Sequence, residues 1–147
     1  GVRYVDILDR LCEAGRLGRK TGAGYYTYVD GKQQATTDEA VRHIIEDASQ
    51  RRGIQRQPLN SATIQRRALL TIVNEAARLM GEGVASRATD IDVVLVHGYG
   101  FPRWEGGPVF WARQQNREAL TQEIKDLASQ CGDGFVLADL SVLFEDQ

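Results

Sequence analysis

Apolar residues recur at three- and four-residue steps along much of the chain, the spacing that places side chains on one face of a helix. The first such stretch spans residues 2–14 and ends at Gly15, a residue suited to the left-handed position after a helix. A second stretch opens with Thr36 followed by Glu39, a capping-box pattern, and runs up to Gly53. The pattern therefore predicts two helices before the middle of the chain.

The longest helical pattern runs from about Ser61, a candidate N-cap, to Gly81 or Gly83. Its apolar positions form a broad stripe, whereas most of its charged positions fall outside that stripe. We expect this helix to be the core of the fold. The stripe comprises Ile64, Ala68, Ile72, Ala76 and Leu79, flanked by Leu69, Val73 and Met80.

The region after Thr89 predicts a helix followed by a shaped loop. Asp90 and Asp92 would lie in the first turn of this helix, where carboxylates interact well with the helix dipole. The β-branched residues that follow would also permit a strand. Residues 98–108 are rich in glycine and proline, and Pro108 suits the first turn of a short helix. The aromatic residues here, which we expect to plug the space between helices, are Tyr99, Phe101, Trp104, Phe110 and Trp111.

Asn116 is a candidate N-cap of a last helix that stops near Gly132, and residues 135–144 form an apolar tail that we expect to pack on the bundle. Extended structure is indicated only near residues 24–33, where tyrosines precede an Asp30-Gly31 turn signal. The prediction is therefore an all-α helical bundle with at most one short β element.

Composition narrows the function classes. The chain has 147 residues, of which 42% are hydrophobic, and 18 Lys+Arg against 20 Asp+Glu give a formal net charge of −2. This balance argues against a nucleic-acid or membrane-surface binder, and no apolar run approaches the roughly 18 residues that a membrane span needs. Cys12 and Cys131 suit neither a disulfide scaffold nor a zinc site, so a reducing, cytoplasmic location is predicted. Because helical spacing starts directly after Gly1, we expect a piece of a longer protein.

Residues 15–24 contain four glycines and, in addition to Arg16, two further cationic side chains. A loop of this composition could bind phosphate. A P-loop requires lysine directly after its second glycine, and a dinucleotide fingerprint requires a third glycine at fixed spacing. Neither Gly22-Ala-Gly24 nor Gly98-Tyr-Gly100 meets that requirement. We therefore favour a tight reversal over packed tyrosines.

Candidate catalytic groups are few. His43 and His97 are the only histidines, too few for a multi-imidazole metal site. His43 falls beside an apolar pair in a predicted helix, and His97 suits the C-terminal end of the helix predicted after Thr89. Asp90 and Asp92 would point to different helix faces, which favours helix stabilisation over an acid/base or metal pair.

Two motif blocks carry a resemblance to a known family. Residues 15–26, GRLGRKTGAGYY, resemble the segment that closes the first C-terminal helical repeat of the 3-hydroxyacyl-CoA dehydrogenase family. Residues 67–111, which contain VNEA at 73–76, GYGFP at 98–102 and GGP at 106–108, resemble the second such repeat in multifunctional β-oxidation enzymes. The blocks cover most of the chain.

The resemblance implies a fold similar to the C-terminal domain of 6-phosphogluconate dehydrogenase-like enzymes. It assigns residues 1–30 to the end of the first repeat, 31–57 to a helix and connector, and 58–147 to the second repeat. The family's Rossmann domain, which binds NAD, and its catalytic His/Glu pair have no counterpart here. The place of the family's catalytic Asn reads Gln65-Arg66-Arg67, so we assign no catalytic residue, no cofactor site and no metal site.

Three functions remain open after the sequence analysis. The leading one is a non-catalytic domain that supports the substrate cleft of an NAD-dependent 3-hydroxyacyl-CoA dehydrogenase, packed against the first repeat and the Rossmann domain of its parent. The second is an acyl-CoA-binding module in which Arg16, Arg19 and Lys20 contact the CoA phosphates. The third is a helical interaction domain of unrelated function. An apolar surface left bare would also permit self-association.

Overall fold

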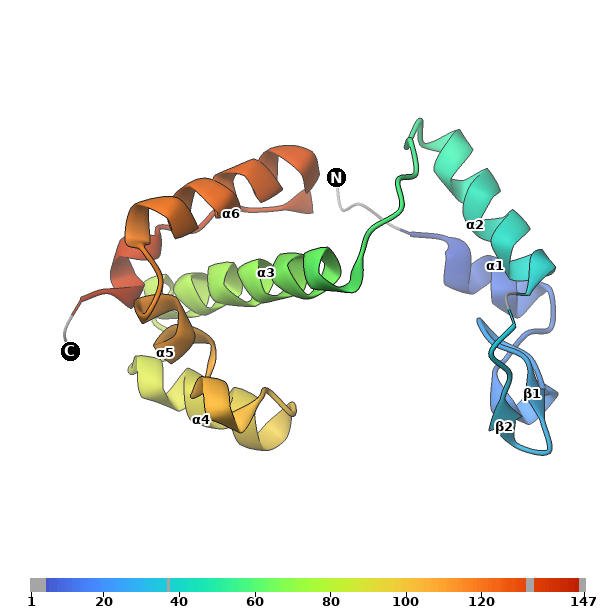
Figure 1. Cartoon of the computed structure of the whole chain (residues 1–147), viewed down its shortest axis with the longest axis horizontal. Coiled ribbons are helices and arrows are strands. Elements are labelled where there is room, and N and C mark those ends of the chain that lie inside the picture. Colours follow the sequence, from blue (N-terminus) through green and yellow to red (C-terminus); the bar gives the residue numbers. More distant parts are fainter. Residues whose placement is uncertain (1–4, 37, 132–133, 146–147) are drawn as a thin grey trace. The chain divides into compact units, whose positions relative to one another are not determined.

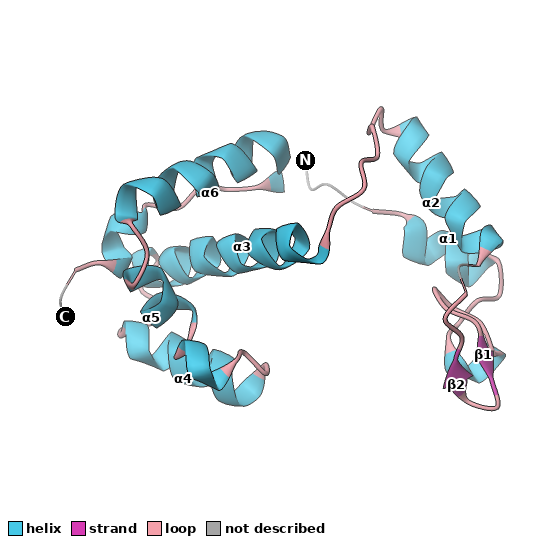
Figure 2. Cartoon of the chain, viewed as in Figure 1, coloured by secondary structure: helices cyan, strands magenta, loops and turns pink. Residues whose placement is uncertain are grey.

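The structure is a computed structural model that describes residues 5–36, 38–131 and 134–145 (Figure 1). These residues form two compact units, one up to Pro58 and one from Leu59 onwards. Helices dominate both units, and the strands in the described ranges form one small hairpin (Figure 2). The predicted all-α fold with one short β element is confirmed. No helix within the described ranges is long and apolar enough to cross a membrane.

The first unit is built on two helices that pack against each other through Leu11, Val41 and Ala48, its buried apolar residues. The helix predicted over 2–14 begins later than expected, since Val5 lies outside it and residues 2–4 lie outside the described ranges. The elements of this unit are α1 (Ile7–Glu13), η1 (Arg19–Thr21), β1 (Tyr28–Val29), β2 (Lys32–Gln33) and α2 (Glu39–Arg51).

The hairpin joins β1 and β2 in antiparallel register, with Tyr28 opposite Gln33 and Val29 opposite Lys32. Asp30 and Gly31 connect the strands with φ angles of 50° and 73°. Two positive φ angles define a type I′ turn, which matches the right-handed twist of the flanking strands. The Asp30-Gly31 turn signal is therefore confirmed.

Two predicted helix caps were wrong. Asp38, not Thr36, caps α2, and its Oδ1 accepts hydrogen bonds from the backbone N–H groups of Ala40 and Val41 at 3.0 and 3.4 Å. In α3, Asn60 rather than Ser61 is the N-cap. In each case a better capping residue stands directly before the first helical residue, where its side chain reaches the exposed N–H groups.

The second unit is organised around α3, which packs against the helices that follow it and against the final turn. The predicted stripe is partly wrong, because Ile64 is 52% exposed and Ala68 is exposed, although Val73 and Ala76 are buried as expected. Leu70 and Ala77, which lie outside the predicted stripe, are buried as well. The elements are α3 (Ser61–Gly81), α4 (Ala88–Gly98), η2 (Arg103–Glu105), α5 (Pro108–Arg113), α6 (Arg117–Cys131) and η4 (Leu140–Leu143).

The other expectations for this unit are largely confirmed. Residues 88–98 form a helix and not the alternative strand, and Pro108 is the first residue of α5. Asn116 caps α6 by accepting a hydrogen bond from the backbone N–H of Ala119 at 2.9 Å, and Gly132 lies outside the described ranges. The tail is docked, with Leu140 and Leu143 in the core.

Candidate functional site

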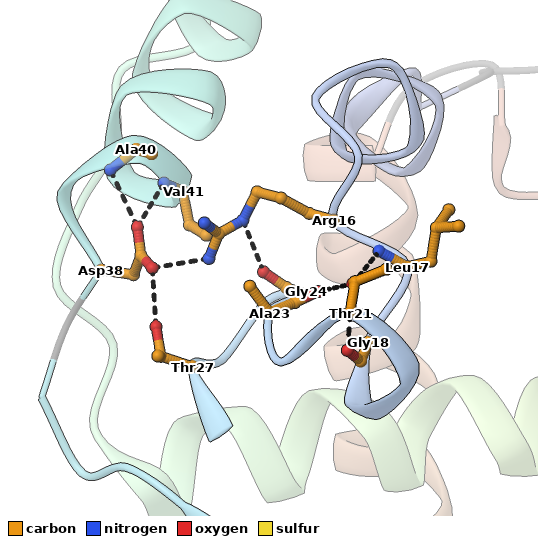
Figure 3. Close-up of polar contacts among 10 residues, drawn as sticks. All are labelled: Arg16, Leu17, Gly18, Thr21, Ala23, Gly24, Thr27, Asp38, Ala40 and Val41. Carbon is orange, nitrogen blue, oxygen red and sulfur yellow. Dashed lines mark hydrogen bonds and ion pairs between the residues drawn. The ribbon is translucent and has the colours of Figure 1, made fainter. Parts of the chain in front are cut away.

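The glycine-rich segment after α1 folds back and forms hydrogen bonds with its own backbone. Thr21 accepts a hydrogen bond from the N–H of Leu17 at 3.0 Å, and its hydroxyl lies within donating distance of the carbonyls of Gly18 and Ala23 (Figure 3). The N–H of Gly18 also donates to the carbonyl of Ala23. A Cβ on Gly24 would lie 2.9 Å from the Cα of Gly18, so glycine is required by close approach. These contacts occupy groups that a phosphate cradle would use.

Arg16 joins this loop to the start of α2. Its Nε donates to the carbonyl of Gly24 at 3.0 Å, and its guanidinium pairs with Asp38 at 2.5 Å (Figure 3). Thr27 donates to the same carboxylate oxygen at 2.8 Å. Two hydrogen bonds hold the pKa of Asp38 below its ordinary value. The bond from Thr27 has the larger effect, and the bond from Arg16 has the next largest. Arg16 is therefore part of a structural junction with Asp38 and Thr27. No sequence pattern had pointed to a role for Asp38 or Thr27.

Arg19 and Lys20, the other predicted phosphate contacts, lie in η1 at the outer edge of the loop, and both are exposed. The Arg19 guanidinium lies over the ring of Tyr28, 5.5 Å from its centroid. The loop does not bury its aromatic neighbours, because Tyr25 and Tyr26 are 42% and 51% exposed. The expectation of packed tyrosines was wrong for these two residues.

Asp92 has a role that sequence analysis missed. It does not lie at the helix surface like Asp90, which pairs with Arg87. Its two carboxylate oxygens accept hydrogen bonds from the backbone N–H groups of Val109 and Phe110, at 2.7 and 3.0 Å. Burial raises the pKa of Asp92 above its ordinary value, and the two backbone hydrogen bonds oppose that rise. Its carboxylate thereby ties α4 to the start of α5.

Asn74 is the other buried polar residue in the part of the chain that the structure describes. Its side chain donates to the carbonyl of Val136 and accepts from the N–H of Ala138, both at 2.9 Å. It therefore holds the C-terminal tail on α3. An amide among the apolar positions of a helix was the available sequence signal, and the structure gives it a packing role.

The aromatic loop behaves differently from the prediction. Tyr99, Trp104 and Phe110 are 79%, 85% and 52% exposed, so they do not plug the space between helices. Trp111 is partly buried against the core and lies under the Arg66 guanidinium. Within α5, Val109 and Ala112 are buried, whereas Phe110 lies on the exposed side of the helix.

Metal chemistry finds no support within the described ranges, where no three His, Cys, Asp or Glu side chains form a candidate cluster. The fold and its polar contacts thus define a class: a mostly helical protein of two compact units, in which the buried side chains of Asn74 and Asp92 serve packing.

Comparison with known proteins shows which proteins the chain resembles. No family model matches the chain. The peroxisomal bifunctional enzyme of Pongo abelii is 42% identical over 89% of this chain, and that of Danio rerio is 36% identical over 85%. The fatty acid oxidation complex subunit alpha of Vibrio campbellii is 31% identical over 91%. The chain spans only 18% of the length of each of these curated relatives.

The chain is therefore similar to one segment of proteins named as peroxisomal bifunctional enzymes, fatty acid oxidation complex alpha subunits and peroxisomal fatty acid β-oxidation multifunctional proteins. The resemblance carried by the two motif blocks is confirmed. This relationship removes the alternative of a helical interaction domain of unrelated function. Which repeat of the family each part of the chain corresponds to stays a prediction.

Proposed function

We propose that this chain is a helical domain that shapes the substrate cleft of an NAD-dependent 3-hydroxyacyl-CoA dehydrogenase acting in fatty-acid β-oxidation. In this proposal NAD binds to another domain of the parent protein, and hydride transfer takes place there. Two relatives, both named peroxisomal bifunctional enzyme, are nearly five times as long as this chain, so they have room for further domains, which supports the proposal that NAD binds elsewhere.

One observation carries the proposal. The buried polar side chains of the second unit, Asn74 and Asp92, both form hydrogen bonds with backbone groups of the same unit. A catalytic group needs an atom directed at a substrate, whereas these side chains fix helices and the tail in place. Such rigidity is what a supporting domain contributes to an active site built elsewhere.

The partners in this proposal are the first helical repeat and the Rossmann domain of the parent. Exposed apolar side chains such as Val93, Val94 and Trp104 are candidates for burial against them. Left uncovered, the same side chains would favour self-association of the isolated chain. A cytoplasmic location stays a prediction, and the peroxisomal names of several relatives make the peroxisome the competing location.

A chimaera tests the proposal. The segment of the Danio rerio peroxisomal bifunctional enzyme that aligns with this chain is replaced by the chain, and NADH formation from a 3-hydroxyacyl-CoA is measured. We expect the chimaera to be active and a deletion of the segment to be inactive. Full activity after deletion would contradict a supporting role.

The isolated chain supplies the complementary measurement. We expect no oxidation of NADH when it is mixed with acetoacetyl-CoA. Turnover by the purified chain that persists after removal of contaminating enzymes would overturn the proposal, because it would require a nucleotide site and a proton donor within this sequence.

A further inference from the structure

The segment that joins α2 to α3, residues 52–60, is exposed along its whole length and runs as a loop between the two helices (Figure 2). Its first residues close α2, since the N–H of Ile54 donates to the carbonyl of Ser49, and its last residue, Asn60, caps α3. Between these ends, residues 55–59 take part in no backbone–backbone hydrogen bond within the described ranges. This stretch therefore lacks the contacts that protect a backbone from a protease.

The amino-acid sequence explains why the two helices are not continuous here. Gly53 ends α2 with a positive φ of 63°. Pro58 has no N–H to donate, and it disfavours helical backbone at Gln57, the residue before it. A protease binds its substrate as a non-helical segment. The residues around Gln57 therefore already meet that requirement in the folded chain.

Arg56 is the basic residue in the middle of this stretch. Its guanidinium lies 3.8 Å from the carboxylate of Glu46, but the two side chains are 50% and 42% exposed, so solvent screens this ion pair. Arg52, the other basic residue of the segment, lies 3.6 Å from Asp6, and its side chain is only 27% exposed. Arg56 is therefore the more accessible arginine of the segment.

Three exposed arginines outside this segment differ from Arg56 in their backbone. Their carbonyls each accept a hydrogen bond from the N–H three residues later, which closes a turn over the peptide bond that a protease would attack. Cleavage there requires the turn to open first. These contacts join Arg19 to Gly22 at 3.3 Å, Arg87 to Asp90 at 3.1 Å and Arg103 to Gly106 at 3.2 Å.

We propose that the segment after α2 is an endoproteolytic processing site, at which a peptidase that accepts arginine hydrolyses the bond between Arg56 and Gln57. Water adds across this amide, so that the carbonyl of Arg56 becomes a carboxylate and the nitrogen of Gln57 becomes a new amino terminus. The buried apolar residues of the first unit precede the bond, and the core cluster of the second unit follows it. Processing therefore separates the two units without cutting either core.

Limited digestion of the purified chain tests the proposal, with trypsin as the arginine-accepting probe. Products are identified by intact-mass spectrometry while the fluorescence of the tryptophans, which lie in the second unit, is followed in parallel. We expect the first cut within the described ranges to fall between Arg56 and Gln57, with no change in fluorescence. A first cut after another basic residue of those ranges, or a loss of fluorescence with the first cut, would overturn the proposal.

Matched variants establish whether this bond controls the digestion. Arg56→Gln should slow the first cut within the described ranges by about tenfold or more, because cleavage elsewhere requires local opening. Gln57→Pro should slow it equally, since trypsin does not accept proline after the arginine, and this variant keeps the charge of Arg56.

Arg87→Gln is the control, because it removes an exposed arginine whose carbonyl is hydrogen-bonded, and it should leave the rate unchanged. Equal rates for Arg56→Gln and the unchanged chain would overturn the proposal. These outcomes are independent of the proposed function, because the digestion contains neither NAD nor a 3-hydroxyacyl-CoA.

Discussion

Asp92 joins two helices through a close approach that only glycine permits. A Cβ at Gly107 would lie 2.4 Å from atoms of the Asp92 side chain, and Gly107 has a φ of 114°. The backbone at Gly107 can therefore pass the carboxylate and present the N–H groups of Val109 and Phe110 to it. Gly107 thus has a packing reason as well as a turn reason.

Replacing Asp92 with alanine should destabilise the second unit by about 2 kcal/mol or more, because the N–H groups of Val109 and Phe110 would lose their acceptors, and Val109 is fully buried. Urea denaturation followed by tryptophan fluorescence measures this change. Asp90→Ala is the control and should cost no more than about 0.5 kcal/mol, since its pair with Arg87 is exposed. Equal losses in both variants would contradict the assigned role of Asp92.

The junction around Asp38 predicts a pH dependence of the first unit. The pKa of Asp38 is lowered from 3.8 by Thr27 and Arg16, so its stabilisation is complete above pH 3.8 and is lost as the pH falls through the lower folded-state pKa. Asp38→Asn should therefore be less stable than the unchanged chain at pH 7. The difference in free energy of unfolding between the two should shrink below pH 3.8. Far-UV circular dichroism during urea denaturation at both pH values checks this result.

Asp30→Asn is the control for that experiment. Asp30 is exposed in the hairpin turn, and asparagine accepts its φ of 50° as readily as aspartate does. The difference in free energy of unfolding between Asp30→Asn and the unchanged chain should therefore not shrink below pH 3.8 in the way expected for Asp38→Asn. A constant difference between Asp38→Asn and the unchanged chain across the pH range would contradict the junction.

The sequence placed Arg16, Arg19 and Lys20 in one loop, but it did not separate their roles. Arg16 turns toward Asp38, which is 22 positions away, and no local spacing rule covers that distance. Asp92 was likewise assigned to its own helix because its partners lie 17 and 18 positions later. Local patterns found the charged loop, whereas the contacts that sort its residues depend on tertiary structure.

At the scale of elements, three helices end in the same way. After α1, α2 and α3 a glycine with positive φ donates its N–H to a carbonyl three residues earlier, and the next residue donates to the carbonyl five residues before itself. This pair of bonds is the Schellman motif. The predicted ends at Gly15 and Gly53 were right because the glycine signal is local, and of the two ends offered for α3, Gly81 and Gly83, it is Gly83 that takes the left-handed position. The starts were less accurate because several capping residues stood close together.

At the end of α3, alanine substitutions at two glycines should change the stability of the second unit in opposite directions. Gly83 has a φ of 70°, so Gly83→Ala should destabilise the second unit by about 1 kcal/mol. Gly81 is helical and its Cβ would meet nothing within 4 Å, so Gly81→Ala should stabilise the unit by about 0.5 kcal/mol. Urea denaturation of both variants checks this, and a shift in the same direction for both would contradict the Schellman end.

At the scale of the whole molecule, periodicity was sufficient for the fold class but not for the division into units. The sequence predicted a bundle around the helix after Ser61, and α3 does organise the second unit. It did not show that the helices before Pro58 form a unit with their own small core. That separation depends on which apolar faces meet, since Leu8 and Ile64 have helical spacing and yet remain exposed.

The unequal cores predict that the two units unfold separately. Leu11, Val41 and Ala48 are the buried apolar residues of the first unit, whereas a much larger cluster from α3 to η4 supports the second. The first unit should therefore unfold at lower urea concentration. Both tryptophans lie in the second unit, so fluorescence should report only the later of the two transitions that far-UV circular dichroism records.

Core variants assign the transitions. Leu11→Ala should lower the midpoint of the first transition only, because truncating a buried leucine costs about 2–5 kcal/mol and its contacts lie within the first unit. Val73→Ala, at a fully buried position of α3, should lower the second transition only. A single transition in which fluorescence and circular dichroism coincide, and which either variant shifts as a whole, would show that the two cores unfold as one.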